Sequence, residues 1–137
     1  MAFKSTYAQA VILNLLLRGQ VLIPPGSTYL ALFTADPTDA NVTANELVNT
    51  GYARQQIGSS LAWNSPSAGA SGQQVSNVNQ IVFGALQTAG ATITHVGIYD
   101  AANGGNLLYH MPLAAAKVLA VGDVIAFAPG QIVIAEA

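Results

Sequence analysis

The stretch from residue 93 to residue 113 constrains the fold more than any other part of the chain. It contains two runs of alternating, β-favouring residues on either side of Asn103-Gly104-Gly105. Asn-Gly and Gly-Gly are the pairs that accept the positive φ angles of tight hairpin turns. The pattern therefore predicts an antiparallel β-hairpin closed by a two-residue loop, either Asn103-Gly104 or Gly104-Gly105. A three-residue loop would change the faces assigned to the side chains.

Alternation along this hairpin predicts which side chains share a face, because successive strand residues point to opposite sides of a sheet. The apolar face, which we expect to join the core, carries Val96, Ile98, Leu107, Tyr109 and Met111. The other face carries His95, Gly97, Tyr99, Leu108 and His110.

Residues 5–18 have the period of an amphipathic helix. One stripe holds Ala8, Val11, Ile12, Leu15 and Leu16. Thr6 and Gln9 have the spacing of a capping box at the helix start, and Gly19 supplies the left-handed residue that commonly closes a helix. We expect this helix to lie on a sheet. The alternative is that it docks on a neighbouring subunit.

The rest of the chain is predicted to consist of short strands separated by turns. Tyr29 to Phe33 is apolar on both faces, which favours a central strand between the helix and the sandwich core. Residues 58–74 are small or polar and predict a long surface loop. About eight or nine short strands at regular spacing are typical of an antiparallel β-sandwich or jelly roll. We therefore predict a mainly β single domain over residues 1–137 with one N-terminal α-helix.

Charge is the most unusual feature of the composition. Charged residues make up 7% of the chain and hydrophobic residues 52%, whereas soluble domains carry roughly 25% charged residues. Such a surface is either uncharged and polar or covered by other subunits. Four scattered basic residues argue against a nucleic-acid partner. The apolar run at 10–17 is too short to span a membrane, and the absence of Cys excludes disulfides and thiol chemistry.

The search for chemistry is mostly negative. His95 and His110 fall on one strand face, so a two-histidine metal site is conceivable, but a third ligand is lacking and Asp100 lies on the other face. No Gly-x-Ser-x-Gly elbow is present, and no Gly-rich segment is followed by Lys-Ser or Lys-Thr. The sequence therefore predicts no catalytic residues, no metal and no cofactor.

Several segments resemble, in their order and spacing, a family of small tailed-bacteriophage virion proteins. They are the helix Thr6-Tyr7-Ala8 to Leu15-Leu16-Leu17, Tyr29-Leu-Ala-Leu-Phe-Thr-Ala-Asp-Pro-Thr-Asp39, Gly51-Tyr-Ala-Arg-Gln55, Thr94-His-Val-Gly-Ile-Tyr-Asp-Ala101, Gly104-Gly-Asn-Leu-Leu108 and Ala128-Pro-Gly130. Members of this family are labelled tail-fibre-like proteins or capsid decoration (cement) proteins. The resemblance spans nearly the whole chain and implies a β-sandwich that assembles, with no enzymatic residues to carry over.

Composition and resemblance together favour a capsid decoration protein. It would be made in the host cytoplasm, bind the major capsid protein at the capsid exterior, stabilise the shell and form homotrimers or homodimers. The alternative is a tail or tail-fibre component involved in host attachment, and a carbohydrate-binding module or an enzyme ranks third. Contacts are expected from residues 1–5 or from the 58–74 loop, where Trp63 would either anchor the loop or contact a partner. The candidate interface residues are Phe3, Lys4, Trp63, Asn64 and Pro66.

Overall fold

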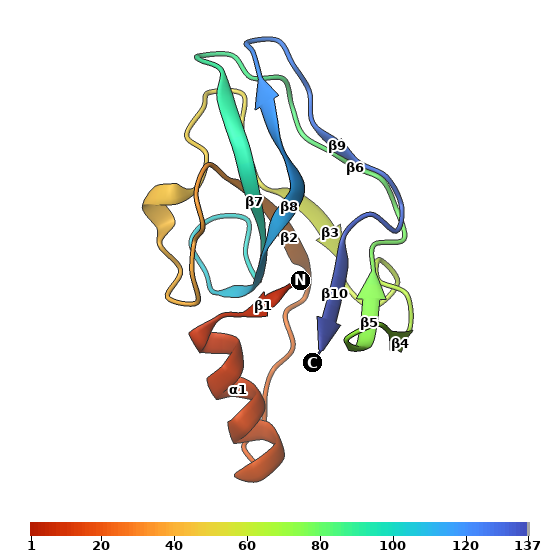
Figure 1. Cartoon of the computed structure of the whole chain (residues 1–137). Coiled ribbons are helices and arrows are strands. Elements are labelled where there is room, and N and C mark those ends of the chain that lie inside the picture. The colour runs from red at the N-terminus through yellow and green to blue at the C-terminus, as the bar shows by residue number, and fades with distance from the viewer. Residues whose placement is uncertain (137) are drawn as a thin grey trace.

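The structure is a computed structural model and is described over residues 1–136. It is mainly β, with antiparallel sheets arranged as a sandwich and one N-terminal helix, which confirms the predicted fold class (Figure 1). The elements are β1 Phe3–Lys4, α1 Thr6–Leu17, β2 Thr28–Phe33, a 3₁₀ turn Thr43–Asn45, β3 Gln55–Gly58, β4 Ser67–Gly69, β5 Gly72–Ser76, β6 Ile81–Val82, β7 Ala91–Tyr99, β8 Leu107–Leu119, β9 Ala126–Phe127 and β10 Val133–Glu136.

The largest sheet has the strand order β1-β8-β7-β2-β3, and the predicted hairpin forms its centre as β7 and β8. Val96 pairs with Met111 and Ile98 with Tyr109. This is the register predicted for an Asn103-Gly104 loop, although the connection between the strands is longer. The Asp100 carboxylate closes that connection by accepting from the Asn106 amide at 2.7 Å and from the Asn106 side chain at 2.9 Å.

Two side chains of the hairpin, Leu107 and Leu108, were assigned to the wrong face, and Leu108 packs against the main core instead of sharing the face of Tyr99. The register shifts between Ile98 and Tyr99, and this shift places Leu107 opposite Tyr99. Leu107 therefore packs with Tyr99, Ala31 and Phe33 in a second cluster instead of joining Val96. The longer connection, with its own hydrogen bonds, produces this offset, which a simple two-residue turn would not.

Both faces of the central strand β2 are buried, as predicted. Leu30 and Leu32 face the main core, to which the hairpin and the second and third sheets contribute. The other members of that core are Leu47, Ile81, Phe83, Leu86, Ile93, Val96, Ile98, Ile125, Phe127, Ile132 and Ile134. Tyr109 and Met111 pack against it while partly buried. The second face is covered by the segment after β2, where Pro37 is fully buried and the Thr34 amide donates to the Asn45 carbonyl.

Helix α1 does not lie on the sheet, so that prediction is wrong. It starts directly after β1 and projects away from the body (Figure 1). Ala8 is the only helix residue that is fully buried. The predicted capping box is also one residue out. Ser5 is the cap, because its Oγ accepts from the Ala8 amide at 3.1 Å and also donates to the Leu107 carbonyl. Gly19 closes the helix with φ +63°, as predicted.

The prediction of a long surface loop over residues 58–74 is wrong, because this stretch contains β4 and the start of β5. β4 and β5 form a hairpin within and beyond this stretch, and β5 pairs with the last strand in the order β10-β5-β4. Ile134 of β10 lies opposite Val75. The strand partner is supplied by a segment about 60 residues away, so the local composition alone, rich in Ser, Gly and Ala, favours a loop.

Candidate assembly surface

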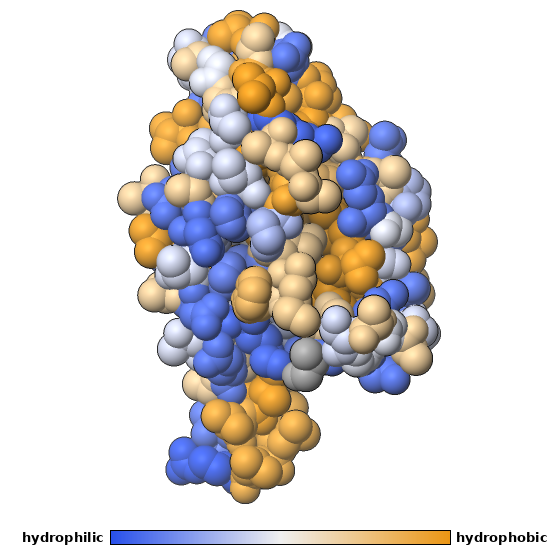
Figure 2. Space-filling model, in the orientation of Figure 1, coloured by the Kyte–Doolittle hydropathy of each residue, from blue (hydrophilic) through white to orange (hydrophobic). Residues whose placement is uncertain are grey.

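Exposed apolar side chains gather on α1 and on the segment that follows it (Figure 2). The exposed fractions are 73% for Leu16, 79% for Leu17, 91% for Val21 and 87% for Ile23. The helical apolar surface, as we define it, comprises Tyr7, Leu13, Leu15, Leu16, Leu17, Val21, Leu22 and Ile23. Patches of this kind on a soluble protein mark interaction sites, because an exposed helix with apolar residues nearly all round is normally buried.

The sequence of α1 places apolar side chains on two opposite sides of the helix, so a single neighbouring segment cannot cover both. At 100° per residue, Ala8, Val11 and Ile12 share one side, and these residues line a groove with Leu22 and Pro25 of the returning segment. The opposite side carries Ala10, Leu13 and Leu17, at the spacing of a helix–helix seam. The helix thus has an inner apolar side that its own chain covers and an outer apolar side that it does not.

The two ends of α1 carry opposite charge. At the start, Asp39 accepts from the Thr6 amide through its carbonyl at 2.8 Å and from the Gln9 side chain through its carboxylate at 3.1 Å. At the end, the Arg18 guanidinium donates to Asn14 Oδ1 at 3.2 Å. Both positions agree with the helix dipole, which favours negative charge at the N-terminus and positive charge at the C-terminus.

His110 lies beside the negative end and is 5% exposed. Its Nε2 is 2.7 Å from Asp39 Oδ1, and its Nδ1 is 3.4 Å from Asp36 Oδ1. Phe3 stacks on the imidazole at 5.7 Å between ring centroids. His110 thus fixes the loop that holds Asp36 and Asp39 against β1 and β8, next to the start of α1.

The other histidine, His95, lies diagonally from His110 in the β7–β8 register, because His95 is opposite Pro112 and His110 is opposite Gly97. Its Nδ1 bonds with the Thr94 hydroxyl at 2.8 Å. Within residues 1–136, no three potential ligand side chains converge in the geometry of a metal site.

Lys4 of β1 forms an ion pair with Glu136 of β10. Its Nζ lies 2.5 Å from Glu136 Oε2, and the Tyr109 hydroxyl donates to the same carboxylate. Burial favours a higher pKa for Glu136, but the hydrogen bonds from Lys4 and Tyr109 outweigh it and lower the pKa. Burial, together with the hydrogen bond to Glu136, raises the pKa of Tyr109. The ammonium group of Lys4 is therefore engaged in an ion pair within its own chain.

Trp63 is half-buried, and its Nε1 donates to Thr28 Oγ1 at 3.0 Å. Asn64 bonds with the backbone of Ser76 in both directions, at 3.0 Å and 2.7 Å. Pro66 is exposed beside them. Trp63 and Pro66 line an apolar groove of about 310 Å³ at the junction of the β8 and β5 sheets. These contacts make Trp63 and Asn64 anchors for the start of the β4–β5 hairpin.

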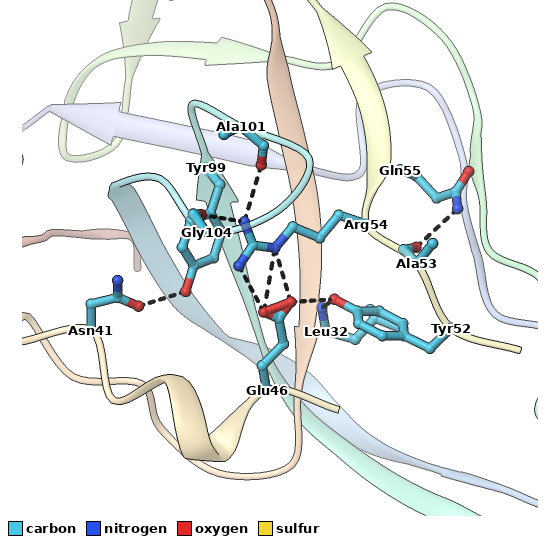
Figure 3. A network of polar contacts seen from close by, with 10 residues as sticks. All are labelled: Leu32, Asn41, Glu46, Tyr52, Ala53, Arg54, Gln55, Tyr99, Ala101 and Gly104. Atoms are coloured by element: carbon cyan, nitrogen blue, oxygen red, sulfur yellow. Dashed lines mark hydrogen bonds and ion pairs between the residues drawn. The ribbon is translucent and has the colours of Figure 1, made fainter. Parts of the chain in front are cut away.

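A polar network that the sequence did not reveal surrounds Arg54 (Figure 3). Its Nε and Nη2 donate to the two Glu46 carboxylate oxygens, both at 2.9 Å, and its Nη1 donates to the carbonyls of Ala101 at 3.0 Å and Gly104 at 2.7 Å. The guanidinium also lies 3.6 Å above the Tyr99 ring. Arg54 therefore fastens the β7–β8 loop to the segment around Glu46.

Protonation in this network follows from burial and charge. Burial lowers the pKa of Arg54, but the hydrogen bond and charge of Glu46 more than offset this and raise it. Burial raises the pKa of Tyr99 to about 12. The Tyr52 hydroxyl donates to Glu46 at 3.0 Å and accepts from the Leu32 amide. Four of the five N–H groups of the Arg54 guanidinium donate to partners within the chain, an arrangement that rigidifies the fold.

Within residues 1–136, every buried side-chain nitrogen and oxygen has a hydrogen-bond partner, and no helix is long and apolar enough to cross a membrane. The uncovered apolar helix is the surface of the described residues best suited to contact another molecule. The chain matches the sequence model of the podophage GP4 fiber I protein gp80 over residues 4–135 and belongs to this family. It is thus a structural protein of a tailed-phage virion, which confirms the resemblance found in the sequence. No curated protein matches the chain.

Proposed function

We propose that the protein is a component of a tail fibre that takes part in host attachment. The match of residues 4–135 to a fibre protein family carries this proposal. Because of this match we now rank the tail-fibre function above the capsid decoration function, which composition and resemblance had favoured. The structure supports a mechanical role, because the Arg54 network and the Lys4–Glu136 pair hold a rigid body while α1 offers an apolar contact surface.

Neighbouring virion proteins would contact the remaining exposed groups. Phe3, 49% exposed, and Pro66 are available for such contacts. Lys4, Trp63 and Asn64 would contribute only the atoms left over by their internal bonds. A structural role of this kind needs neither a cofactor nor catalysis.

A capsid decoration protein that binds the major capsid protein on the capsid exterior is the second candidate. The observation that favours it is the 7% content of charged residues together with the helical apolar surface. A low-charge, apolar face suits a permanent contact that is repeated many times across a shell.

The two candidates differ in copy number and in position. The test is quantitative mass spectrometry of purified particles relative to the major capsid protein, with gold-labelled antibody to show the site. We expect a small number of copies at the tail, and particles lacking the protein that keep shell stability but adsorb poorly to cells. Hundreds of copies over the shell, together with heat-sensitive particles when the protein is absent, would contradict the fibre proposal and support the capsid decoration protein.

A further inference from the structure

We infer that α1 is a self-association element, and that its outer apolar side in one copy packs antiparallel against the same side of a second copy around a two-fold axis. The inference concerns contacts between copies and holds for the isolated protein in solution. It therefore does not depend on whether the protein belongs to the fibre or to the shell.

The area of the outer side suits a small interface. A fully exposed aliphatic side chain presents about 100 Å² of apolar surface, as transfer energies imply. Weighted by their exposed fractions, Leu13, Leu16, Leu17 and Val21 present about 300 Å², because Tyr7, Leu15, Leu22 and Ile23 lie on the inner side or line its groove. At about 65% apolar, this corresponds to an interface of about 460 Å² per partner, below the standard size of about 800 Å² and in the range of weak, transient pairs.

The outer side of α1 has the pattern of a helix–helix seam. Ala10, Leu13 and Leu17 follow each other at spacings of three and four residues, with Leu16 beside them. The small side chain of Ala10 allows a second helix to approach closely. Leu13 lies at the middle of this seam, so a two-fold axis would pass next to it.

Charge decides the direction of the second helix. Among residues 1–136, Arg18 forms no ion pair, while Asp36 and Asp39 are about half-exposed, at 53% and 49%, and contact only His110 as an ionisable partner. The helix spans 12 residues, about 18 Å at 1.5 Å per residue. An antiparallel pair therefore brings Arg18 of each copy to the acidic loop of the other. A parallel pair would place like charges side by side, which is unfavourable.

The first test measures the mass of the full-length chain by sedimentation velocity at about 100 µM, since interfaces below about 1,200 Å² in total are at the weak end of specific association. The wild type is expected to sediment as a dimer. The double variant Leu13→Gln, Leu17→Gln is expected to be a monomer with an unchanged far-ultraviolet circular dichroism spectrum, because both side chains are exposed. The control, Val118→Gln, is 80% exposed on β8 and should remain dimeric. A monomeric or trimeric wild type, or a double variant that stays dimeric, would overturn the proposal.

The second test uses the absence of cysteine from the chain. Leu13→Cys should form an intermolecular disulfide rapidly on mild oxidation, because the two copies of residue 13 lie near the axis. Arg18→Cys should crosslink at least tenfold more slowly, as should Val118→Cys. Rapid crosslinking through residue 18 would show a parallel pair, and equal rates at all three positions would show that no specific pair forms; either result contradicts the proposal.

Discussion

The β-sandwich, which we call the body, and α1 differ in how their side chains are covered. Around Arg54, a few charged and aromatic groups are buried and bonded to each other, with the Arg54 side chain 7% exposed and that of Glu46 16% exposed. On α1, the outer leucines have no cover from their own chain. The body therefore owes its stability to internal contacts, whereas α1 needs contacts from outside. One chain thus combines a self-sufficient domain core with an element whose partner is another molecule.

The largest expected effect tests the self-sufficiency of the body. Arg54→Ala leaves the Glu46 carboxylate partly buried without its partner, and breaking a buried ion pair in this way costs about 3–5 kcal/mol. Urea unfolding followed by tryptophan fluorescence measures the change. Lys117→Ala, on the exposed part of β8, is the matched control and should change the free energy of unfolding by less than about 0.5 kcal/mol. A loss below about 1 kcal/mol for Arg54→Ala would show that the network is dispensable.

A comparison of equal truncations sharpens the contrast between core and helix. Ile98, 3% exposed, should lose about 2–5 kcal/mol on truncation to Ala, as buried large-to-small changes do. Leu17→Ala, at 79% exposure, should stay within about 0.5 kcal/mol when unfolding is measured in dilute, monomeric protein. Similar losses at both positions would mean that α1 is part of the core.

The junction between the two regions is expected to give a smaller effect. Ser5→Ala removes both the cap of α1 and the bond to the Leu107 carbonyl, a loss of about 1–2 kcal/mol. Hydrogen exchange over residues 6–17 should accelerate more than exchange in β7. Thr6→Ala is the control, and it should behave like the wild type because Thr6 does not cap the helix. Faster exchange in Thr6→Ala than in Ser5→Ala would restore the cap predicted from the sequence.

The smallest effect concerns pH. The pKa of Glu136 is lowered in the folded protein, so its pair with Lys4 contributes stability above the unfolded value of about 4.3 and loses it as pH falls through the lower folded value. Both side chains are partly exposed, so the contribution is about 1 kcal/mol or less. Glu136→Gln should flatten the unfolding free energy between about pH 5 and pH 2 relative to the wild type. An identical acid slope in both proteins would contradict this role.

The parts of the fold that the sequence predicted are those with local signals. The β7–β8 register follows from alternation around Asn103-Gly104, and α1 follows from its period and from Gly19. The positions of Leu107 and Leu108 were missed because hydrogen bonds within the connecting loop shift the register. The β4–β5 hairpin was missed because its partner strand is far away in sequence.

The candidate site divides in the same way. The helical pattern is identical whether the apolar side meets the same chain or a second copy, so sequence alone left both alternatives open for α1. The Arg54–Glu46 pair joins a strand to a polar segment that carries no periodic signal. The low content of charged residues could have indicated this pair. With only four basic residues in the chain, few pairings with a carboxylate need to be considered. The proposed contacts at Phe3 and Pro66 stay predictions.

The measurement that tests the division between body and α1 most directly is the thermal unfolding midpoint as a function of protein concentration. For the wild type we expect the midpoint to rise by about 5 °C over a hundredfold range, since association stabilises the folded state by mass action. The Leu13→Gln, Leu17→Gln variant should unfold cooperatively at a constant midpoint equal to that of the dilute wild type. A wild-type midpoint that does not depend on concentration, or a double variant that does not fold, would contradict the account.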